Sequence, residues 1–491
     1  MDRRKFLQQA ALAGTTLAVS GPARAADSPA RLPNVLLFHL DQMRQPRWFP
    51  ASAKFPNLER LKAKGVEFTR HFTSAVPCSP SRACLFTGLH MDQHQVMTNV
   101  MKGQQPSLDP SIPTLGQMFR RAGYQTPYFG KWHLTLERQV DLQGGLEPYG
   151  FDWVARQRQV FPFPGLETDP EYTRAACAWL KEPAHRKQPW FMVISLINPH
   201  DICLYPRLAV PAAEVPKVVD RLPGNWNDDL LGKPRCQAEF QKAYAAMGGP
   251  IRLDDQPVWR QYLDDYHYLT MKNDHHLGQV LDTLEASGQT GQTVVIFTSD
   301  HGEMAGSHRL RVKGPFVYVE NTNVPLVISW PKKFPAGVHT DALCQNLDLF
   351  PTLARLIGVD PAAQYPYLPG RDLTPILKNP TRPAVSEHVL FSYTGNAALA
   401  RADRDLRKAG VQSPDHVRAL RERDWVYARY FAPNSPRQEL ELYDFKNDPL
   451  EMHNLAQDPG YQKRRKEMAE KLQQAEATEM ARSRYLSSSG K

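Results

Sequence analysis

Four short apolar segments restrict the fold of this chain more than any other feature, because each ends in polar or charged residues. The segments are rich in Val, Ile, Leu and Phe, as buried parallel strands are, and helical patterns such as 268–288 alternate with them. This alternation predicts an α/β fold. The segments and the residues that follow them are NVLLFHL with Asp41 and Gln42, GYQTPYFG with Lys131, Trp132 and His133, WFMVISLIN with Pro199 and His200, and TVVIFTS with Asp300 and His301.

The ends of these segments predict a single site. Ligands of open α/β sheets bind beyond the carboxyl ends of the strands, so we expect carboxylates, imidazoles and an ammonium group at one edge of one sheet. Each residue alone allows a plainer interpretation: Asp41 as a capping residue, His200 as a structural histidine, and Asp300 with His301 as part of an ordinary loop. Their joint occurrence favours a metal or catalytic site.

Length and composition limit the possible classes of protein. A chain of 491 residues allows two or three domains, at about 100 to 200 residues each. Beyond the N-terminal region, no segment is long and apolar enough to span a membrane. No run of Lys and Arg with interleaved aromatic residues indicates nucleic acid. We therefore expect neither a stable membrane anchor nor a nucleic acid partner.

The N-terminal residues indicate export. Arg3 and Arg4 precede a moderately apolar run, and Ala23-Arg24-Ala25 offers a small-residue cleavage site. This order predicts a twin-arginine signal peptide at 1–25, recognised by the twin-arginine export machinery, and a periplasmic location. Because that route carries folded proteins, a modification can be completed before export. Removal of the signal takes away four basic residues and one acidic residue, and lowers the formal charge from +9 to +6.

The six cysteines do not predict a disulfide framework. They are widely scattered, with neither a C-x-x-C pair nor the His spacing of structural zinc sites. If Cys78 is used chemically, an odd number remains, and we expect the core to hold the fold. The cysteines are Cys78, Cys84, Cys177, Cys203, Cys236 and Cys344.

The segment AVPCSPSRACLFTG, residues 75–88, combines a thiol, two hydroxyls and an arginine at the predicted start of a helix. A helix N-terminus offers free N–H groups and partial positive charge, which favour anionic oxygen. A buried, inert Cys78 would leave the nearby Arg82 unexplained. The segment therefore predicts chemistry at Cys78.

In its motifs the chain resembles the formylglycine-dependent sulfatases of the alkaline phosphatase superfamily. CSPSRACLFTG matches the signature C-x-P-S-R, and the similarity covers nearly the whole chain after the signal, in the family's order. The other matching segments are PNVLLFHLDQ, GYQTPYFGKWHL, SLINPHD, TSDHGE, RVKGPF, ENTNVPLVISWP, NLDLFPTLARLIG, PGRDLTPIL and LYDFKNDPLEMHNLA.

The resemblance implies an alkaline phosphatase-like large α/β domain, with a mixed sheet between helices, at 31–378. It also implies a smaller C-terminal α+β subdomain, with an antiparallel sheet and a packed helix, at 379–491. The basic and acidic residues of the last segment, YQKRRKEMAEKLQQAEATEMARSRY, predict a surface helix.

The resemblance also implies the chemistry of sulfate ester hydrolysis. A formylglycine-generating enzyme would read C-x-P-S-R on the unfolded chain and oxidise Cys78, whose hydrated aldehyde is the nucleophile. His133 would remove the second proton of the diol and His200 would protonate the leaving oxygen. The remaining implied catalytic residues are Arg82, which would hold the diol, and Lys131 and Lys313, which would neutralise sulfuryl oxygens.

The implied ligands of one divalent cation are Asp41, Gln42, Asp300, His301 and the modified Cys78. Many sulfatases have Asp-Asp and Asp-Asn at the first and fourth motifs, so Gln42 and His301 are departures. Calcium prefers an all-oxygen shell, and a nitrogen donor admits manganese or magnesium as alternatives. Calcium remains the first expectation from the family.

Two alternatives remain open. The Asp-Gln and Asp-His pairs also resemble the branch of choline sulfatases and phosphonate monoester hydrolases, so hydrolysis of phosphonate monoesters or phosphodiesters is the second enzymatic hypothesis. A chain with unmodified Cys78 would instead be a non-catalytic binder of sulfated glycans. The substrate, a small-molecule or saccharide sulfate ester, is not specified by these motifs. Tyr205 and Trp226 are candidates for a pocket wall, and a core role is an equal alternative for Trp226.

Overall fold

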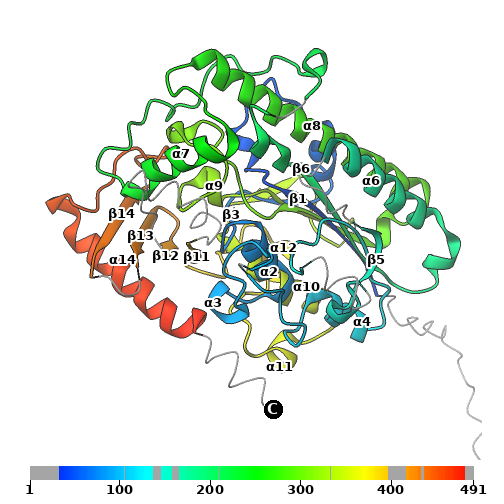
Figure 1. Ribbon diagram of the computed structural model, residues 1–491. Coiled ribbons are helices and arrows are strands. Elements are labelled where there is room, and N and C mark those ends of the chain that lie inside the picture. The colour runs from blue at the N-terminus through cyan, green and yellow to red at the C-terminus, as the bar shows by residue number, and fades with distance from the viewer. Residues whose placement is uncertain are drawn as a thin grey trace, which may run out of the picture. The chain divides into compact units, whose positions relative to one another are not determined.

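The computed structural model describes residues 32–103, 105–136, 145–156, 165–207, 210–331, 333–395, 416–432 and 436–481, so the predicted signal at 1–25 lies outside the described residues. Pro33–Lys491 form one compact unit. At its centre is a sheet of eight strands in the order β5-β4-β6-β1-β7-β8-β2-β9 (Figure 1). The strands are β5 (Asp152–Arg156), β4 (Pro127–Gly130), β6 (Phe191–Pro199), β1 (Asn34–Asp41), β7 (Thr293–Ser299), β8 (Leu326–Ser329), β2 (Val66–Phe68) and β9 (Val338–Thr340).

The four predicted strands are adjacent in this sheet. β4, β6, β1 and β7 pair in parallel, whereas β8 is antiparallel to its neighbours, so the sheet is mixed as expected. All residues of β1, β6 and β7 are buried. Apolar runs without alternation are typical of strands that are covered on both faces. The carboxyl ends of the four strands therefore lie at one edge of the sheet, as their sequences predict.

Helices cover both faces of the sheet. Leu36 and Phe38 of β1 pack in the apolar cluster that includes α6 (Gly165–Lys181) and α8 (Gln256–Ala286). Val35 and Leu37 point to the other face, because side chains of a strand alternate. Figure 1 shows α6 and α8 together on one side and α2, α10 and α12 on the other. The elements of that second face include α2 (Cys78–Thr87), α4 (Leu115–Arg121), α10 (Leu349–Leu356) and α12 (Thr374–Lys378).

Helix α2 begins at Cys78, as predicted, and every one of its residues is buried. It ends at Gly88, which adopts φ = 67° and donates its backbone N–H to the Cys84 carbonyl. A glycine is favoured there because other residues rarely adopt a left-handed conformation at a helix end. The helix is thus fixed at both ends, with its N-terminal residue in the interior of the protein.

A second sheet is formed by the C-terminal part of the chain. Its four strands are antiparallel, and α14 (Gln462–Ala475) packs against it through Met468 and Leu472, which confirms the predicted small sheet with a packed helix. The division at 378/379 falls between α12 and the first of these strands and stays a prediction. The strands are β11 (Val389–Thr394), β12 (His416–Arg421), β13 (Trp425–Phe431) and β14 (Gln438–Asp444).

The C-terminal sheet contacts the segment that leads into α2. Ala75 forms a bridge with Ser392 of β11, and the Ser392 N–H donates to the Ser74 carbonyl at 2.9 Å. Val76 shares an apolar cluster with Phe391 and Tyr430. The backbone just before Cys78 is therefore held by residues more than three hundred positions later in the sequence.

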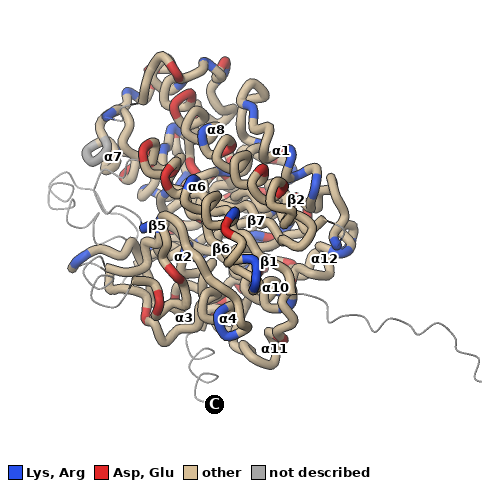
Figure 2. The backbone as a smooth tube through the Cα atoms, turned by 90° about the vertical axis from the view of Figure 1, so that its right-hand side faces the viewer, with Lys and Arg blue, Asp and Glu red and all other residues tan. Residues whose placement is uncertain are grey.

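The surface of the described residues is mixed in charge. Figure 2 shows acidic and basic residues interspersed over α1 (Pro56–Lys62), α6 and α8. In the part of the chain that the structure describes, no helix has both the length and the apolar character needed to cross a membrane. All six cysteines lie among the described residues and all are free thiols, which agrees with a fold held by its core.

Candidate active site

Asp41, His200 and Asp300, which the sequence predicts for the site, lie at the carboxyl ends of neighbouring strands. An irregularity in the pairing with β1, where β6 has two additional residues between Ser195 and Pro199, aligns Asp41 with Pro199 and brings Asp41 beside the segment that contains His200. On the other side, Leu40 pairs with Ser299 of β7, so that Asp41 lies next to Asp300. Parallel pairing therefore brings together residues that are far apart in the sequence.

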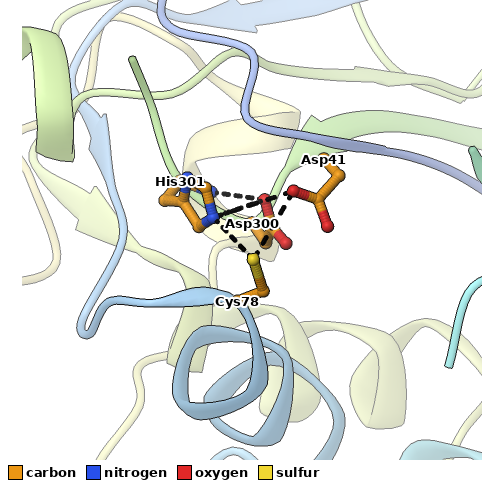
Figure 3. Close-up of side chains that lie close together, drawn as sticks. All are labelled: Asp41, Cys78, Asp300 and His301. Carbon is orange, nitrogen blue, oxygen red and sulfur yellow. Dashed lines mark hydrogen bonds and ion pairs between the residues drawn. The ribbon is translucent and has the colours of Figure 1, made fainter. Parts of the chain in front are cut away.

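Asp41, Cys78, Asp300 and His301 form one buried group that could hold a metal ion (Figure 3). One ligand atom from each residue lies within 4.8 Å of the others. The Cys78 Sγ is 3.2 Å from His301 Nε2 and 3.6 Å from Asp41 Oδ1. Figure 3 shows the thiol at the first turn of α2 pointing toward the two carboxylates and the imidazole. These are four of the five predicted metal ligands.

The ring of His301 is oriented for ligation. Its Nδ1 lies 3.0 Å from the Gly302 carbonyl, which can only accept a hydrogen bond, so Nδ1 carries the proton. Nε2 then presents its lone pair to the group, 3.6 Å from Asp300 Oδ1 and 3.8 Å from Asp41 Oδ1. Metal-binding histidines are commonly fixed in this way by a hydrogen bond at the second ring nitrogen.

The two carboxyl groups differ in their electrostatic surroundings. Burial and the charge of Asp41 raise the pKa of Asp300 to about 7. Burial would also raise the pKa of Asp41, but the charge of Lys131 holds it well below its usual range. Two buried carboxyl groups with oxygen atoms within 4.8 Å of one another favour the binding of a cation, which neutralises their charge. The donor set of two carboxylates and an imidazole therefore fits a divalent ion.

Lys131 lies at the carboxyl end of β4, with its Nζ 2.6 Å from Asp41 Oδ2, and both side chains are fully buried. The preceding Gly130 has φ = 95°, and a Cβ at this position would lie 2.1 Å from the Ser195 carbonyl oxygen. Only glycine fits this close approach of two strands. Gly130 therefore allows the chain to turn the ammonium group of Lys131 into the site.

Arg82 is fully buried beneath the site and joins several of its parts. Its Nε donates to the Trp132 carbonyl at 2.9 Å, and one of its terminal nitrogens donates to Lys131 O and to Ser195 Oγ. The other terminal nitrogen lies 3.4 Å from Asp300 Oδ2 and 3.6 Å from Asp41 Oδ2. Arg82 thus fixes the backbone of the segment that presents Lys131, in addition to facing both carboxylates.

Gln42 follows Asp41 in a left-handed conformation, φ = 74°. Its backbone N–H donates to Asp300 Oδ1 at 3.0 Å. Its side-chain Oε1 accepts from Lys313 Nζ at 2.5 Å and from Cys203 Sγ at 3.1 Å. The hydrogen bond between them therefore holds Gln42 and Lys313 together at the site. Ligation of a metal by Gln42 stays a prediction.

His133 and His200 lie close enough to Lys131 and Lys313 to be affected by their charges. The His133 carbonyl accepts from Ser79 Oγ at 2.6 Å, which ties its segment to α2. Burial and the charge of Lys131 hold the pKa of His133 well below 6.5. Burial and the charges of Lys313 and Lys131 do the same for His200. Both imidazoles are therefore neutral at neutral pH before a ligand binds.

Two residues of the site were not predicted. Glu303 is fully buried and accepts a hydrogen bond from Gln42 Nε2 at 2.5 Å. Cys203, three residues after His200, donates its thiol to the same glutamine. Glu303 stands in the motif TSDHGE, so its nearness to His301 in sequence was an available signal, whereas nothing local distinguishes Cys203.

A pocket opens beside Lys313 and the residue that precedes Cys78. Aromatic side chains from α7 (Arg235–Gly248) and β11 form much of its lining. Tyr205 and Trp226, the candidates from sequence, pack in the core instead. The residues around the pocket are Val76, Pro77, Asn99, Cys203, Phe240, Tyr244, Val312, Lys313, Gly314 and Tyr393.

Comparison with known proteins identifies the family of this chain. The Sulfatase family model matches residues 33–359, and the model "N-sulphoglucosamine sulphohydrolase, C-terminal" matches 306–478. A Delta 4,5-hexuronate-2-O-sulfatase of Bacteroides thetaiotaomicron is 27% identical over 469 residues, 91% of this chain and 89% of that protein. A choline-sulfatase of Rhizobium meliloti is 27% identical over 468 residues, 87% of this chain and 83% of that protein.

Solved structures share the fold. A phosphonate monoester hydrolase from Silicibacter pomeroyi superposes with a TM-score of 0.73 at 22% identity, over 91% of this chain and 96% of that one. This likeness confirms the expected α/β architecture and says nothing of the substrate. The family model covers most of the described chain, including the segments that carry Asp41, Cys78, Lys131, His200 and Asp300. The chain therefore belongs to the sulfatase family.

Proposed function

We propose that this sulfatase hydrolyses the sulfate monoester of a saccharide, with a formylglycine made from Cys78 as nucleophile and one divalent cation. The observation that carries the proposal is the position of the Cys78 Sγ inside a buried group of two carboxylates and an imidazole. A thiol that served only the core would gain nothing from these polar neighbours, because burying charged groups costs free energy. The relatives that act on sulfated saccharides support the choice of substrate.

The cation site would consist of Asp41, Asp300, His301, Gln42 and the oxidised residue 78. A bound cation polarises the sulfuryl oxygens and lowers the pKa of the attacking hydroxyl. Calcium is our first assignment, by family, with manganese and magnesium as alternatives. Arg82 and Lys131 supply further positive charge, and Lys131 is already within 2.6 Å of Asp41.

The remaining residues would act on the ester and on its protons. Lys131 and Lys313 would bind the sulfuryl oxygens, where negative charge accumulates. His133, whose pKa is held low, would accept the proton of the second hydroxyl of the diol after transfer of the sulfuryl group, so that sulfate leaves and the aldehyde forms again. His200 would donate a proton to the leaving oxygen. Since Lys313 and Lys131 lower the pKa of His200, a sulfuryl anion bound between them would offset their charge and raise that pKa.

The aromatic lining of the pocket supports a substrate whose alcohol part contains a ring, as in a sugar. Phe240 and Tyr244 lie stacked, with ring centroids 5.9 Å apart, and Tyr393 lines the pocket with them. Aromatic faces of this kind pack against the apolar face of a sugar ring. Asn99 and Lys313 add polar groups that can orient hydroxyls or a second anionic group.

We also infer export by the twin-arginine route to the periplasm after modification by a formylglycine-generating enzyme. The support is the paired arginines and cleavage site at 1–25, and the motif C-x-P-S-R at 78–82. Because Cys78 is fully buried in the folded protein, the modifying enzyme would act before folding is complete.

The test is peptide mass spectrometry of the purified native protein, with Cys84 as an internal control. Trypsin cleaves after Arg70 and Arg82, so Cys78 and Cys84 fall in separate peptides, 71–82 and 83–102. We expect Cys84 to react with an alkylating reagent after denaturation and residue 78 to carry an aldehyde instead of a thiol. An intact thiol at 78 contradicts the proposed catalysis and favours a glycan-binding protein.

A substrate panel tests the chemistry of the ester. It contains 4-nitrophenyl sulfate, 2-O- and 6-O-sulfated saccharides, choline sulfate and a phosphonate monoester. We expect the highest kcat/KM on a sulfated saccharide. A higher kcat/KM on the phosphonate monoester would establish the second enzymatic hypothesis instead, and preference for choline sulfate would contradict the saccharide assignment.

A further inference from the structure

Glu303 is a buried carboxylate that no step of the proposed reaction uses, although it contacts the site. It lies two residues after His301 and is fully inaccessible to solvent. Its Oε1 accepts from Tyr262 OH at 2.7 Å, Ala305 N at 2.9 Å and Val312 N at 2.6 Å. Its Oε2 accepts from Gln42 Nε2 at 2.5 Å. All four partners are donors, so both oxygens act as acceptors.

The contact with Gln42 decides which way its amide points. An amide group is nearly symmetric in shape, and only its hydrogen-bond partners distinguish the two orientations. As observed, Gln42 Nε2 faces a carboxylate and Oε1 faces the ammonium of Lys313. The reverse orientation would set an oxygen against Glu303 and an NH₂ group against Lys313, which is unfavourable on both sides.

Glu303 also supports the segment that carries Lys313. Val312 adopts φ = 59°, a left-handed conformation that is strained for a β-branched residue. Its N–H donates to Glu303 and its carbonyl accepts from Met304 N at 3.1 Å. The same carboxylate thus accepts hydrogen bonds from three residues with positive φ, Gln42, Ala305 and Val312, and two of them, Gln42 and Val312, are each next to a group of the site.

We propose that Glu303 is a positioning residue that fixes the Gln42 amide with Oε1 toward the reaction centre and holds Lys313 against it. The inference rests on the proposed function in one respect, that a divalent cation binds beside Gln42. Glu303 itself touches neither substrate nor cation. Its role is to make one of two near-equivalent amide orientations the stable one.

The main variants exchange donors and acceptors without changing size. In Glu303→Gln, the oxygen of the new amide can keep its three donors, but its NH₂ group then faces Gln42 and turns that amide over. We expect cation affinity to fall roughly 10- to 100-fold, as for other groups that orient metal ligands. In the double variant Q42E/E303Q the hydrogen bond is restored with donor and acceptor exchanged, and most of the affinity should return.

The control is Glu441→Gln. Glu441 is also fully buried and accepts from Gln237 Nε2 at 2.8 Å, Tyr443 OH at 2.7 Å and Tyr430 OH at 2.5 Å, but it lies in the C-terminal sheet. This variant should lower the unfolding midpoint and leave cation affinity unchanged. If E303Q does not fold, Glu303→Asp and Glu441→Asp serve as the pair, since a shorter side chain keeps the charge but draws back from Gln42.

The measurement is isothermal titration of metal-stripped protein with Mn²⁺ and with Ca²⁺, alongside thermal unfolding. Unchanged affinity in E303Q, equal loss in E441Q, or a double variant no better than E303Q would each overturn the proposal. Because the titration needs no substrate, it stays informative even if the parent protein hydrolyses no sulfate ester, which would refute the proposed function alone.

Discussion

The ion pair of Lys131 with Asp41 gives the strongest test of the charge balance in the site. The change is Lys131→Met, which removes the ammonium and nearly keeps the length of the side chain. Two unit charges 2.6 Å apart attract by about 6 kcal/mol at an effective dielectric constant of about 20. Removal of one partner of a buried pair typically costs about 3 to 5 kcal/mol, because the other charge stays buried.

The expected loss depends on whether a cation is bound. Without it, the cationic group within 4 Å that remains to Asp41 among the described residues is Arg82 at 3.6 Å, and we expect the free energy of unfolding to fall by about 3 to 5 kcal/mol. A divalent cation between Asp41 and Asp300 would replace the missing charge, so the loss should be clearly smaller in the loaded protein. Activity should fall roughly 10²- to 10³-fold even when loaded, since a donor to the sulfuryl oxygens is gone.

The assay is urea denaturation of parent and variant, with chelator and with saturating cation, and kcat on a sulfate ester. Each comparison is made at one cation concentration, because binding itself stabilises the folded state. The matched control is Lys217→Met, whose partner Asp264 lies 3.6 Å away and whose own side chain is 69% exposed. We expect a cost below about 1 kcal/mol there. Equal losses of stability with and without cation would refute the reasoning, as would full activity of K131M.

Two further predictions concern the leaving group and the metal. Replacing His200 by Ala should lower kcat/KM roughly 10²- to 10⁴-fold on saccharide sulfates and far less on 4-nitrophenyl sulfate, since a weakly basic phenolate needs little protonation. Equal losses across leaving groups of graded pKa would mean that His200 only binds sulfuryl oxygens, with Lys313 the next candidate for the acid. Metal-stripped enzyme should regain activity with calcium, measured together with elemental analysis, and full reactivation by manganese but not by calcium would overturn the calcium assignment.

The strands and the polar residues at their ends could be predicted because local sequence specifies them, whereas the family resemblance supplied the expectation that Asp41, Cys78, Asp300 and His301 bind one cation together. Buried parallel strands have continuous apolar runs, and the residue after each run lies at the edge where ligands bind, which locates Asp41 and Asp300. Lys313 follows no strand, and only the family resemblance indicated it. The helix at Cys78 was predicted from the residues of its own segment.

The pocket and Glu303 could not be predicted in this way, because their contacts are made by distant segments. The aromatic wall comes from α7 and β11, whereas the sequence suggested Tyr205 and Trp226, which the fold places in the core. The role of Glu303 depends on Tyr262 of α8 and on Gln42, and neither is near it in the chain. The motif TSDHGE marks Glu303 as a neighbour of the site, but its hydrogen bonds to distant segments leave no local pattern.

The bridge between Ala75 and Ser392 has a consequence for the order of events during synthesis. Cys78 is made about 300 residues before β11, and His301, whose imidazole contacts its thiol, also follows it in the chain. At about 5 to 20 residues per second, translation leaves this segment without its final partners for roughly 15 to 60 s. The fold therefore sets a delay between the appearance of the thiol on the ribosome and its enclosure. Faster translation or an earlier partner for residues 74–76 would shorten the period in which the proposed oxidation can occur.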